Sequence, residues 1–151
     1  MTDPINPKVN RCLKDKHFDH LDHALGRPVD PLRESFRNHF CTGGKDAEQK
    51  AASPHWDNRG EKFESMFFSV SDEGRKALAA HLKEIGDQHR HFVVVWNPSW
   101  ADEPATMHVA AKTHADARYD RYLSASDVNE DLTYMGFSKN ASVKLYRGVA
   151  A

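Results

Sequence analysis

The chain has 151 residues, of which 39% are hydrophobic and 28% charged, and this composition is typical of an ordinary folded protein. Its 21 basic and 22 acidic residues give a formal net charge of −1, which excludes a polybasic protein that binds nucleic acid or membranes through overall charge. The longest apolar run, residues 92–96, is far shorter than the ~20 residues of a membrane helix, and the polar start lacks a secretion signal. We therefore expect a cytoplasmic protein without a membrane partner.

Cysteine and histidine are the residues here whose chemistry depends most on their surroundings. Cys12 and Cys41 lack the spacing of a metal or redox motif, so we expect two reduced thiols. Ten histidines are many for this length, and their protonation should raise the net charge as the pH falls through ~6.5.

The first part of the chain has mainly helical patterns. Residues 1–16 contain two prolines and no apolar periodicity, which predicts an arm over the surface. Apolar residues then repeat every three or four positions at 17–25 and again at 31–40, where Asp30 is a suitable N-cap, so two helices are predicted. A third, short helix of good helix formers is predicted at 45–52.

A hairpin and a well-marked helix complete this part. The polar sequence at 57–60 predicts a turn, and the aromatic and β-branched residues at 63–70 predict the strand that follows it. Ser71 caps a helix that ends at Gly86. Because the pattern then changes from helical to extended, we place a module boundary after residue 87.

The second module, residues 88–151, has mainly extended patterns. Strands are predicted at 91–96 and 106–112, paired antiparallel, and a half-buried edge strand at 142–147. A helix over 115–123 covers the sheet, and the apolar residues after it form one more helical turn or an apolar plug. The sequence therefore predicts an α+β protein: a surface arm, a helical module at 17–87, and a small β-β-α-β module.

The element order of the first module resembles that of a winged helix. In MarR-like and related winged-helix families, a strand that closes the wing enters a helix through a hydroxyl residue, an acidic residue, Gly-Arg and an apolar residue. Ser71, Glu73, Gly74, Arg75 and Leu78 match this pattern. Capping, the helix dipole and close backbone approach also explain these residues without any DNA.

The resemblance implies a nucleic-acid interface, with a recognition helix at 45–52 and a wing tip at 57–62. The candidate nucleic-acid-binding residues are Lys45, Gln49, Lys50, Arg59 and Lys62. Residues 45–62 contain four basic and four acidic side chains, and this balance is unusual for a protein that binds duplex DNA. The partner is therefore either nucleic acid or a host protein.

A group of histidines and aspartates lies on the first predicted helix: His17, Asp19, His20, Asp22 and His23. Their spacing differs from that of the HExxH metallopeptidases, and the third histidine rotates away from the first two. We interpret the group as a solvated polar face and expect no metal, no cofactor and no enzymatic activity. A metal-dependent enzyme is the alternative hypothesis.

Aromatic residues in the second module suggest a binding surface. Tyr119 and Tyr122 fall on the stripe predicted to pack on the sheet, whereas Trp100 lies on a projecting connection. Exposed aromatics on loops are common in protein interfaces, so Trp100 is the candidate protein-binding residue. No phosphate-binding glycine loop or nucleophile elbow is present.

Two groups of segments carry a further resemblance. The first group is HALGRPVDPLRESFRNHF (23–40), SPHW (53–56) and VSDEGR (70–75), and the second is ARYDRYL (117–123), SDV (126–128) and DLTY (131–134). They resemble two kinds of small protein encoded in tailed phages and prophages of proteobacteria. The resemblance implies a phage accessory role in the host cytoplasm, either as a nucleic-acid-binding regulator of transcription or as a protein-binding inhibitor of a host or defence factor.

Overall fold

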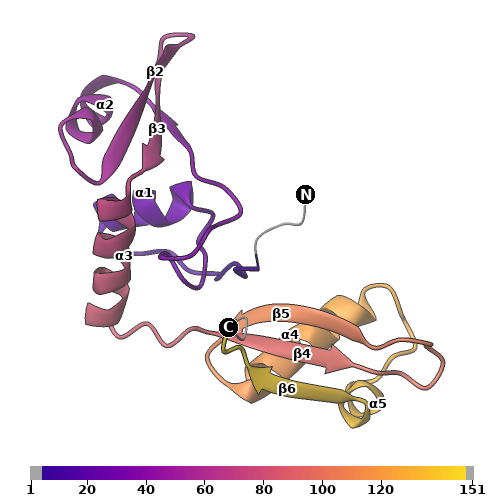
Figure 1. The fold of residues 1–151 in the computed structure, drawn as a ribbon. Helices are drawn as coiled ribbons and strands as arrows, with labels where there is room; N and C mark the ends of the chain where they lie inside the picture. Colours follow the sequence, from indigo (N-terminus) through magenta and orange to yellow (C-terminus); the bar gives the residue numbers. More distant parts are fainter. Residues whose placement is uncertain (1–4, 149–151) are drawn as a thin grey trace. The chain divides into compact units, whose positions relative to one another are not determined.

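The computed structural model describes residues 5–148, and the chain divides into two compact units, Met1–Asp87 and Gln88–Ala151. Each unit contains helices and a three-stranded antiparallel sheet (Figure 1). The α+β class predicted from the sequence is therefore confirmed.

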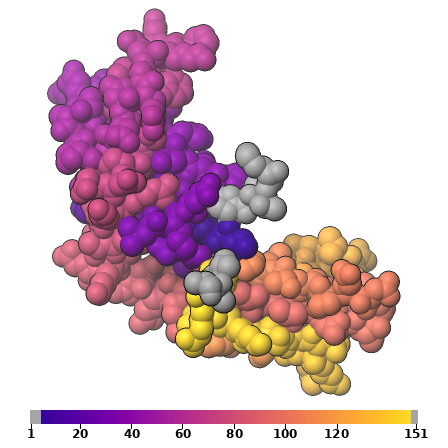
Figure 2. Space-filling view, in the orientation of Figure 1, coloured from indigo at the N-terminus to yellow at the C-terminus, as the bar shows by residue number. Residues whose placement is uncertain are grey.

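Unit 1 combines helices with a sheet in which the strand order is β1-β3-β2. Its elements are α1 (Lys16–Ala24), β1 (Phe40–Thr42), α2 (Gly44–Ala51), β2 (Trp56–Lys62), β3 (Ser65–Val70) and α3 (Asp72–Glu84). The core is formed by Leu21, Ala24, Leu25, Ala47, Trp56, Phe68, Val70, Leu78 and Leu82. The β2–β3 hairpin extends beyond the helices of this unit, and its tip forms a projection in the space-filling view (Figures 1 and 2).

The helix predicted at 31–40 is wrong, because this stretch is irregular as far as the start of β1. The side chains of Asn6 and Arg75 donate hydrogen bonds of 2.8 to 3.1 Å to four backbone carbonyls between residues 30 and 34. These carbonyls are acceptors that an α-helix would need for its own hydrogen bonds. The apolar residues of the predicted stripe are left on the surface, with Phe36 73% exposed. A single helix, α2, therefore lies between α1 and the hairpin, where the sequence predicts two.

Residues 5–15, predicted as part of a surface arm, pack into unit 1. Val9 is fully buried, and Arg11 forms two hydrogen bonds to Asp22, from Nε at 2.9 Å and from a terminal nitrogen at 2.6 Å. The carboxylate of Asp22 is also fully buried, so this bidentate pair ties the segment to α1. Residues 1–4 of the predicted arm lie outside the described residues.

The hairpin turn predicted at 57–60 is also wrong, because these residues lie within β2. The register between β2 and β3 shifts between Asn58 and Gly60, where the φ of +104° at Gly60 accommodates a β-bulge. The chain reverses instead at Phe63 and Glu64, which both have positive φ as in a two-residue hairpin turn. The predicted wing tip at 57–62 is therefore part of a strand, and the real tip follows it.

The helix predicted after Ser71 is confirmed as α3. The Ser71 hydroxyl accepts a hydrogen bond of 3.1 Å from the backbone N–H of Gly74. Leu78 and Leu82 are buried on one face, and Gly86 ends the helix region with a φ of +73°. This helix follows from local signals alone.

Unit 2 has helices on one face of a sheet with strand order β5-β4-β6. Its elements are β4 (Arg90–Trp96), β5 (Ala105–Ala111), α4 (His114–Ser126), α5 (Tyr134–Lys139) and β6 (Ala141–Leu145). Both strand pairs are antiparallel, with Val94 of the central strand opposite Met107 on one side and Val143 on the other. The predicted β-β-α-β order and the edge strand are confirmed, and the additional helical turn is α5.

The core of unit 2 lies between the sheet and its two helices. It contains Phe92, Val94, Trp96, Val109, Ala111, Ala117, Ala125 and Phe137. Hydroxyl caps begin both helices: Thr113 accepts a hydrogen bond from Asp116 N–H, and Thr133 accepts one from Gly136 N–H, both at 3.0 Å. The connection from β4 to β5 and the one from α4 to α5 meet near the end of β4, and these connections form the site described next.

Candidate functional sites

The residues predicted to bind nucleic acid are only partly brought together. Lys45, Gln49, Arg59 and Lys62 are exposed on α2 and β2. Lys50 has to be removed from this set, because it is only 5% exposed and cannot reach a phosphate group.

Lys50 is held inside unit 1 by polar and aromatic contacts. Its Nζ lies 2.6 Å from Oδ1 of Asp46 and 2.9 Å from Nδ1 of His20. The ammonium group also lies over the rings of Phe40 and Trp56, at 4.8 and 5.2 Å from their centroids. Lys50 therefore neutralises a partly buried carboxylate, and the helical period places it on the inner face of α2.

The remaining exposed charges on α2 and the hairpin do not form a basic surface. The basic residues are Lys45, Arg59 and Lys62, and the acidic residues are Glu48, Asp57, Glu61 and Glu64. Binding to duplex DNA depends on several cations that displace counterions from phosphates. With four acidic and three basic groups, this surface lacks that excess of cations.

The hairpin tip presents an exposed aromatic ring. Phe63 is 87% exposed, and Nζ of Lys62 lies 5.7 Å from its ring centroid. A base of a single strand can stack on such a ring next to a cation. This tip is the part of the predicted interface that retains a geometry suited to nucleic acid.

The three histidines of α1 do not converge on one point. Nε2 of His17 lies 2.8 Å from Nδ1 of His55, whereas His20 contacts Lys50 and His23 contacts Arg37. Within residues 5–148, no group of three or more histidine, cysteine, aspartate or glutamate side chains is placed to bind a metal ion.

The aspartates of α1 are bound to arginines. Asp19 accepts a hydrogen bond of 2.7 Å from Arg27, and Asp22 is bound by both Arg11 and Arg27. These ion pairs occupy the carboxylates that the metal-dependent alternative would need as ligands.

Burial changes the acidity of this cluster. Desolvation, with a smaller effect from the neighbouring His55, lowers the pKa of His17. Desolvation and the positive charge of Lys50 lower the pKa of His20. Burial alone would raise the pKa of Asp46, but hydrogen bonds from Lys50 and from the Thr42 hydroxyl outweigh it and lower that pKa. The ion pair of Lys50 and Asp46 is therefore favoured at neutral pH.

Two cavities flank this face of α1, and His20 lines both. The smaller, about 190 Å³, is bordered by His17, Asp46, Gln49, Lys50 and Trp56 among others. The larger, about 450 Å³, is bordered by Asp19, His23, Arg27, Arg37, His39, Phe40 and Cys41. The polar groups of the smaller cavity largely bind one another, which is typical of a structural network.

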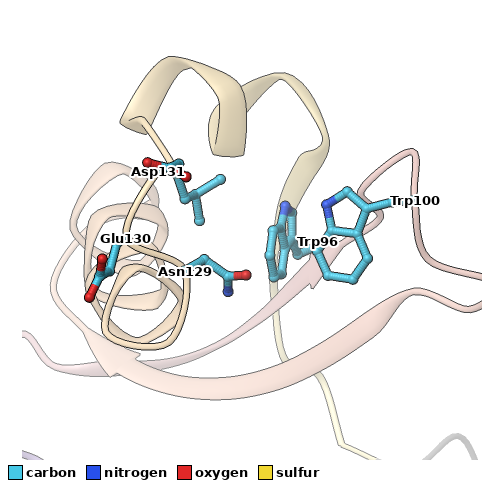
Figure 3. A pocket seen from close by; sticks show the side chains of 6 residues that line it. Trp96, Trp100, Asn129, Glu130 and Asp131 are labelled. Carbon is cyan, nitrogen blue, oxygen red and sulfur yellow. The ribbon is translucent and has the colours of Figure 1, made fainter.

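Unit 2 contains a cavity of about 300 Å³ with two indole walls (Figure 3). We call it the tryptophan cavity, and its lining residues are Trp96, Trp100, Asn129, Glu130, Asp131 and Leu132. The ring centroids of Trp96 and Trp100 are 5.9 Å apart, and the ring planes are inclined at 84°. The two rings thus form a corner, and Asn129 points toward it from the α4–α5 connection, whereas the carboxylates of Glu130 and Asp131 lie at the outer edge of the cavity, away from the rings (Figure 3).

The two indoles differ in how firmly they are held. Trp96 ends β4, is 6% exposed and packs against Phe137, with ring centroids 5.4 Å apart. Trp100 lies on the β4–β5 connection and is 71% exposed, as the sequence predicts. The cavity therefore combines Trp96, which is held in place by packing, with Trp100, which is accessible to a partner.

The α4–α5 connection is tied down by hydrogen bonds. Nδ2 of Asn129 donates to the carbonyl of Ala125 at 2.9 Å, and the Tyr122 hydroxyl donates to the carbonyl of Leu132 at 3.0 Å. The side-chain oxygen of Asn129 has no hydrogen-bond donor among the described residues and points toward Trp96 (Figure 3). It is therefore an acceptor available to an occupant of the cavity.

Sequence reasoning found only one residue of this site. Trp100 was predicted, whereas Trp96, Asn129, Glu130 and Asp131 were missed because they meet only through the fold. The acidic composition of the two connections is the signal that could have found them. The prediction that Tyr119 packs on the sheet is wrong, because this side chain is 52% exposed, whereas Tyr122 packs against the core.

No protein-family model, curated protein or solved structure matches the chain. None of the helices in the part of the chain that the structure describes is long and apolar enough to cross a bilayer. The function is therefore inferred from the chemistry of the sites themselves.

Proposed function

We propose that this chain is an accessory protein of a phage or prophage that binds a host protein through the tryptophan cavity of unit 2. The observation that carries the proposal is the position of Trp100, which is 71% exposed beside a cavity of about 300 Å³. Tryptophan is enriched among the residues that dominate binding energy at protein interfaces, because it combines a large apolar surface with a hydrogen-bond donor.

The charge distribution favours a protein partner over duplex DNA. Lys50 is buried in an ion pair, and the exposed charges on α2 and the hairpin are acidic in balance. An interface with duplex DNA would instead be strongly basic. An interface with a protein needs only an accessible aromatic anchor and a polar rim.

Binding without catalysis is part of the proposal. The ionisable groups of the unit 1 cluster pair with one another: His17 with His55, and Lys50 with Asp46 and His20. The contact of His20 with Lys50 links α1 to α2, and that of His17 with His55 links α1 to the chain before β2. A catalytic site would need some of these groups directed at a substrate.

The setting of the proposed function is the cytoplasm of the host cell. The resemblance to phage-encoded proteins supports this location. Cys12 and Cys41 are exposed and form no disulfide, as in proteins kept in a reducing compartment. The partner would then be a bacterial protein that the phage regulates or inhibits.

Affinity capture with matched variants tests the proposal. The wild-type chain, Trp100→Ala and Met135→Ala are used as baits in host extracts, since Met135 is similarly exposed at 72% but lies outside the cavity. Each captured protein is then purified and titrated against all three chains. We expect one partner whose affinity falls at least tenfold with Trp100→Ala and is unchanged with Met135→Ala. A partner that binds Trp100→Ala as tightly as wild type would contradict the proposal.

A second candidate function is binding of single-stranded nucleic acid at the hairpin tip. The exposed ring of Phe63 beside Lys62 favours it. Fluorescence anisotropy with labelled single strands and duplexes, at increasing salt, tests this candidate. Salt-sensitive binding of single strands that is lost with Phe63→Ser and weakened with Arg59→Ala would support it, and absence of binding at low salt would exclude it.

A further inference from the structure

We propose that the tryptophan cavity binds an alkylammonium group, that is, the side chain of a lysine in the partner protein. This inference rests on the proposed function, because it specifies which group of the partner enters the site. Its basis is the combination of two nearly perpendicular indole rings with the Asn129 amide oxygen and an acidic rim around one cavity.

The indole corner provides the first element of recognition. A cation is attracted to the face of an aromatic ring, most strongly to tryptophan, within about 6 Å of the ring centroid. Because the rings of Trp96 and Trp100 are inclined at 84° with centroids 5.9 Å apart, a compact cation in the corner can contact both rings. Recognition by several aromatic walls is a known solution for alkylammonium ligands.

The Asn129 oxygen and the acidic rim provide the second element. The unused side-chain oxygen of Asn129 points toward Trp96, and the exposed residues Glu130 and Asp131 border the cavity with their carboxylates at its outer edge (Figure 3). A lysine ammonium has three hydrogen-bond donors and no acceptor, so it can donate to the Asn129 oxygen while its charge is attracted by the acidic rim. A charge-assisted hydrogen bond to a carboxylate is about twice as strong as a neutral one.

The two connections around the cavity carry only negative charge. Residues 97–104 and 127–133 contain no lysine or arginine, and their acidic residues are Asp102, Glu103, Asp127, Glu130 and Asp131. None of these five carboxylates forms an ion pair with any residue in the range 5–148. Two of these residues, Glu130 and Asp131, border the cavity, and the negative charge of the two connections favours a positively charged occupant.

The end of α4 adds to this potential. The C-terminus of a helix carries a partial negative charge, and the last turn of α4 contains no basic residue to offset it. One cation is nearby: the guanidinium of Arg121 lies 5.7 Å from the Trp96 ring centroid. Arg121 is not among the residues that line the cavity. The lining itself is therefore free of positive charge.

The shape of the corner favours lysine over arginine. A guanidinium group is planar and stacks parallel to one aromatic ring. The two indole rings are inclined at 84° to each other. A guanidinium that stacks on one ring therefore approaches the other ring edge-on and does not stack on its face. An ammonium group is compact and can use both faces, whether or not it is methylated.

Titration of the full chain with short peptides tests this inference. The probes are glycine-flanked peptides that contain one lysine, one Nε-trimethyl-lysine, one Nε-acetyl-lysine or one arginine, and the signals followed are the indole N–H resonances of Trp96 and Trp100. We expect the lysine or trimethyl-lysine peptide to bind with a Kd of about 1 mM, equivalent to about −4 kcal/mol. The acetyl-lysine and arginine peptides should bind at least tenfold and at least threefold more weakly, respectively.

Charge variants distinguish binding in the tryptophan cavity from general electrostatic attraction of the peptide to the protein. Glu130→Gln combined with Asp131→Asn should weaken the lysine peptide at least fivefold and reduce its salt dependence. Asp116→Asn combined with Asp120→Asn removes the same charge from exposed positions of α4 and should change the affinity less than twofold. An unchanged amide spectrum outside the cavity shows that each variant is folded.

The outcomes distinguish this inference from the proposed function. Equal binding of lysine and acetyl-lysine, or no response of the Trp100 indole to either ammonium peptide, would overturn the inference. If a captured partner nevertheless depends on Trp100, the proposed function stands and the cavity recognises another group. If the ammonium peptide binds while the captured partner does not depend on Trp100, the inference stands and the proposed function fails.

Discussion

Gly74 of α3 lies directly against the backbone carbonyl oxygen of His55, so that a Cβ atom at position 74 would overlap this oxygen. The same Cβ would also lie 2.7 Å from Cγ1 of Val70, which is buried. Neither obstacle is the end of a flexible side chain, so the clash could be relieved only by moving packed structure. Glycine therefore allows the first turn of α3 to pack against the chain before β2.

This contact predicts that Gly74→Ala destabilises unit 1. Alanine normally stabilises a helix interior relative to glycine by about 1 kcal/mol, but overpacking costs roughly 1–3 kcal/mol and should outweigh it. We expect a net loss of up to about 2 kcal/mol, measured by urea unfolding with amide hydrogen exchange of α3 and β3. Glu73→Ala, at an exposed neighbouring position, should change stability by less than about 0.5 kcal/mol. Stability equal to wild type in Gly74→Ala would contradict the clash.

Replacing the buried Lys50 and replacing its partner Asp46 should have different effects on the stability of unit 1. Lys50→Met should leave unit 1 nearly as stable as wild type, because the apolar side chain fills the space beside Phe40 and Trp56 and removes a buried charge. Asp46→Ala should cost about 2 kcal/mol, since it leaves the ammonium with His20 as its remaining polar partner. Urea unfolding at pH 7.5 measures both. Equal losses in the two variants would show that the ion pair, rather than the unpaired charge, determines stability.

Elements with strong local signals could be predicted from the sequence. Ser71 and Thr113 cap α3 and α4 through hydrogen bonds within three residues, so distant parts of the chain have little influence on where these helices begin. The strands of unit 2 were equally predictable, because β4 is a continuous apolar run and the apolar alternation of β5 and β6 matches the face that the helices cover.

Distant hydrogen bonds explain what the sequence did not reveal. Residues 31–40 have the helical period, but Asn6 and Arg75, far away in the chain, bind the carbonyls that a helix would use. The tryptophan cavity is a similar case. Trp100 stands out in the sequence, yet nothing local indicates that Trp96 and Asn129 lie beside it.

The histidines of unit 1 predict a loss of stability in mild acid. Burial lowers the pKa of both His17 and His20 below the value of about 6.5 that they have in the unfolded chain. The unfolded chain therefore binds more protons as the pH falls, so unfolding becomes more favourable. Their contribution to stability is complete above about pH 6.5 and decreases below it. The urea midpoint of unit 1 should thus be lower at pH 5.0 than at pH 7.5.

Histidine variants show whether these two groups cause the effect. His17→Gln combined with His20→Gln should reduce the difference between the two pH values, because no protonation then favours the unfolded chain at these positions. His39→Gln, at an exposed position, should keep the wild-type difference. A wild-type midpoint that rises toward pH 5.0 would contradict the direction of both pKa shifts.

The tip of the β2–β3 hairpin predicts a stabilising substitution. Phe63 and Glu64 have φ values of +52° and +65°, a conformation that Asn-Gly adopts with less strain in a two-residue turn. Phe63→Asn combined with Glu64→Gly should therefore stabilise unit 1 by about 1 kcal/mol, and no core contact is lost because Phe63 is 87% exposed. Phe63→Val is the matched control and should lower stability, because a β-branched residue disfavours positive φ. A lower urea midpoint in the Asn-Gly variant would show that the Phe63 ring supports the hairpin despite its exposure.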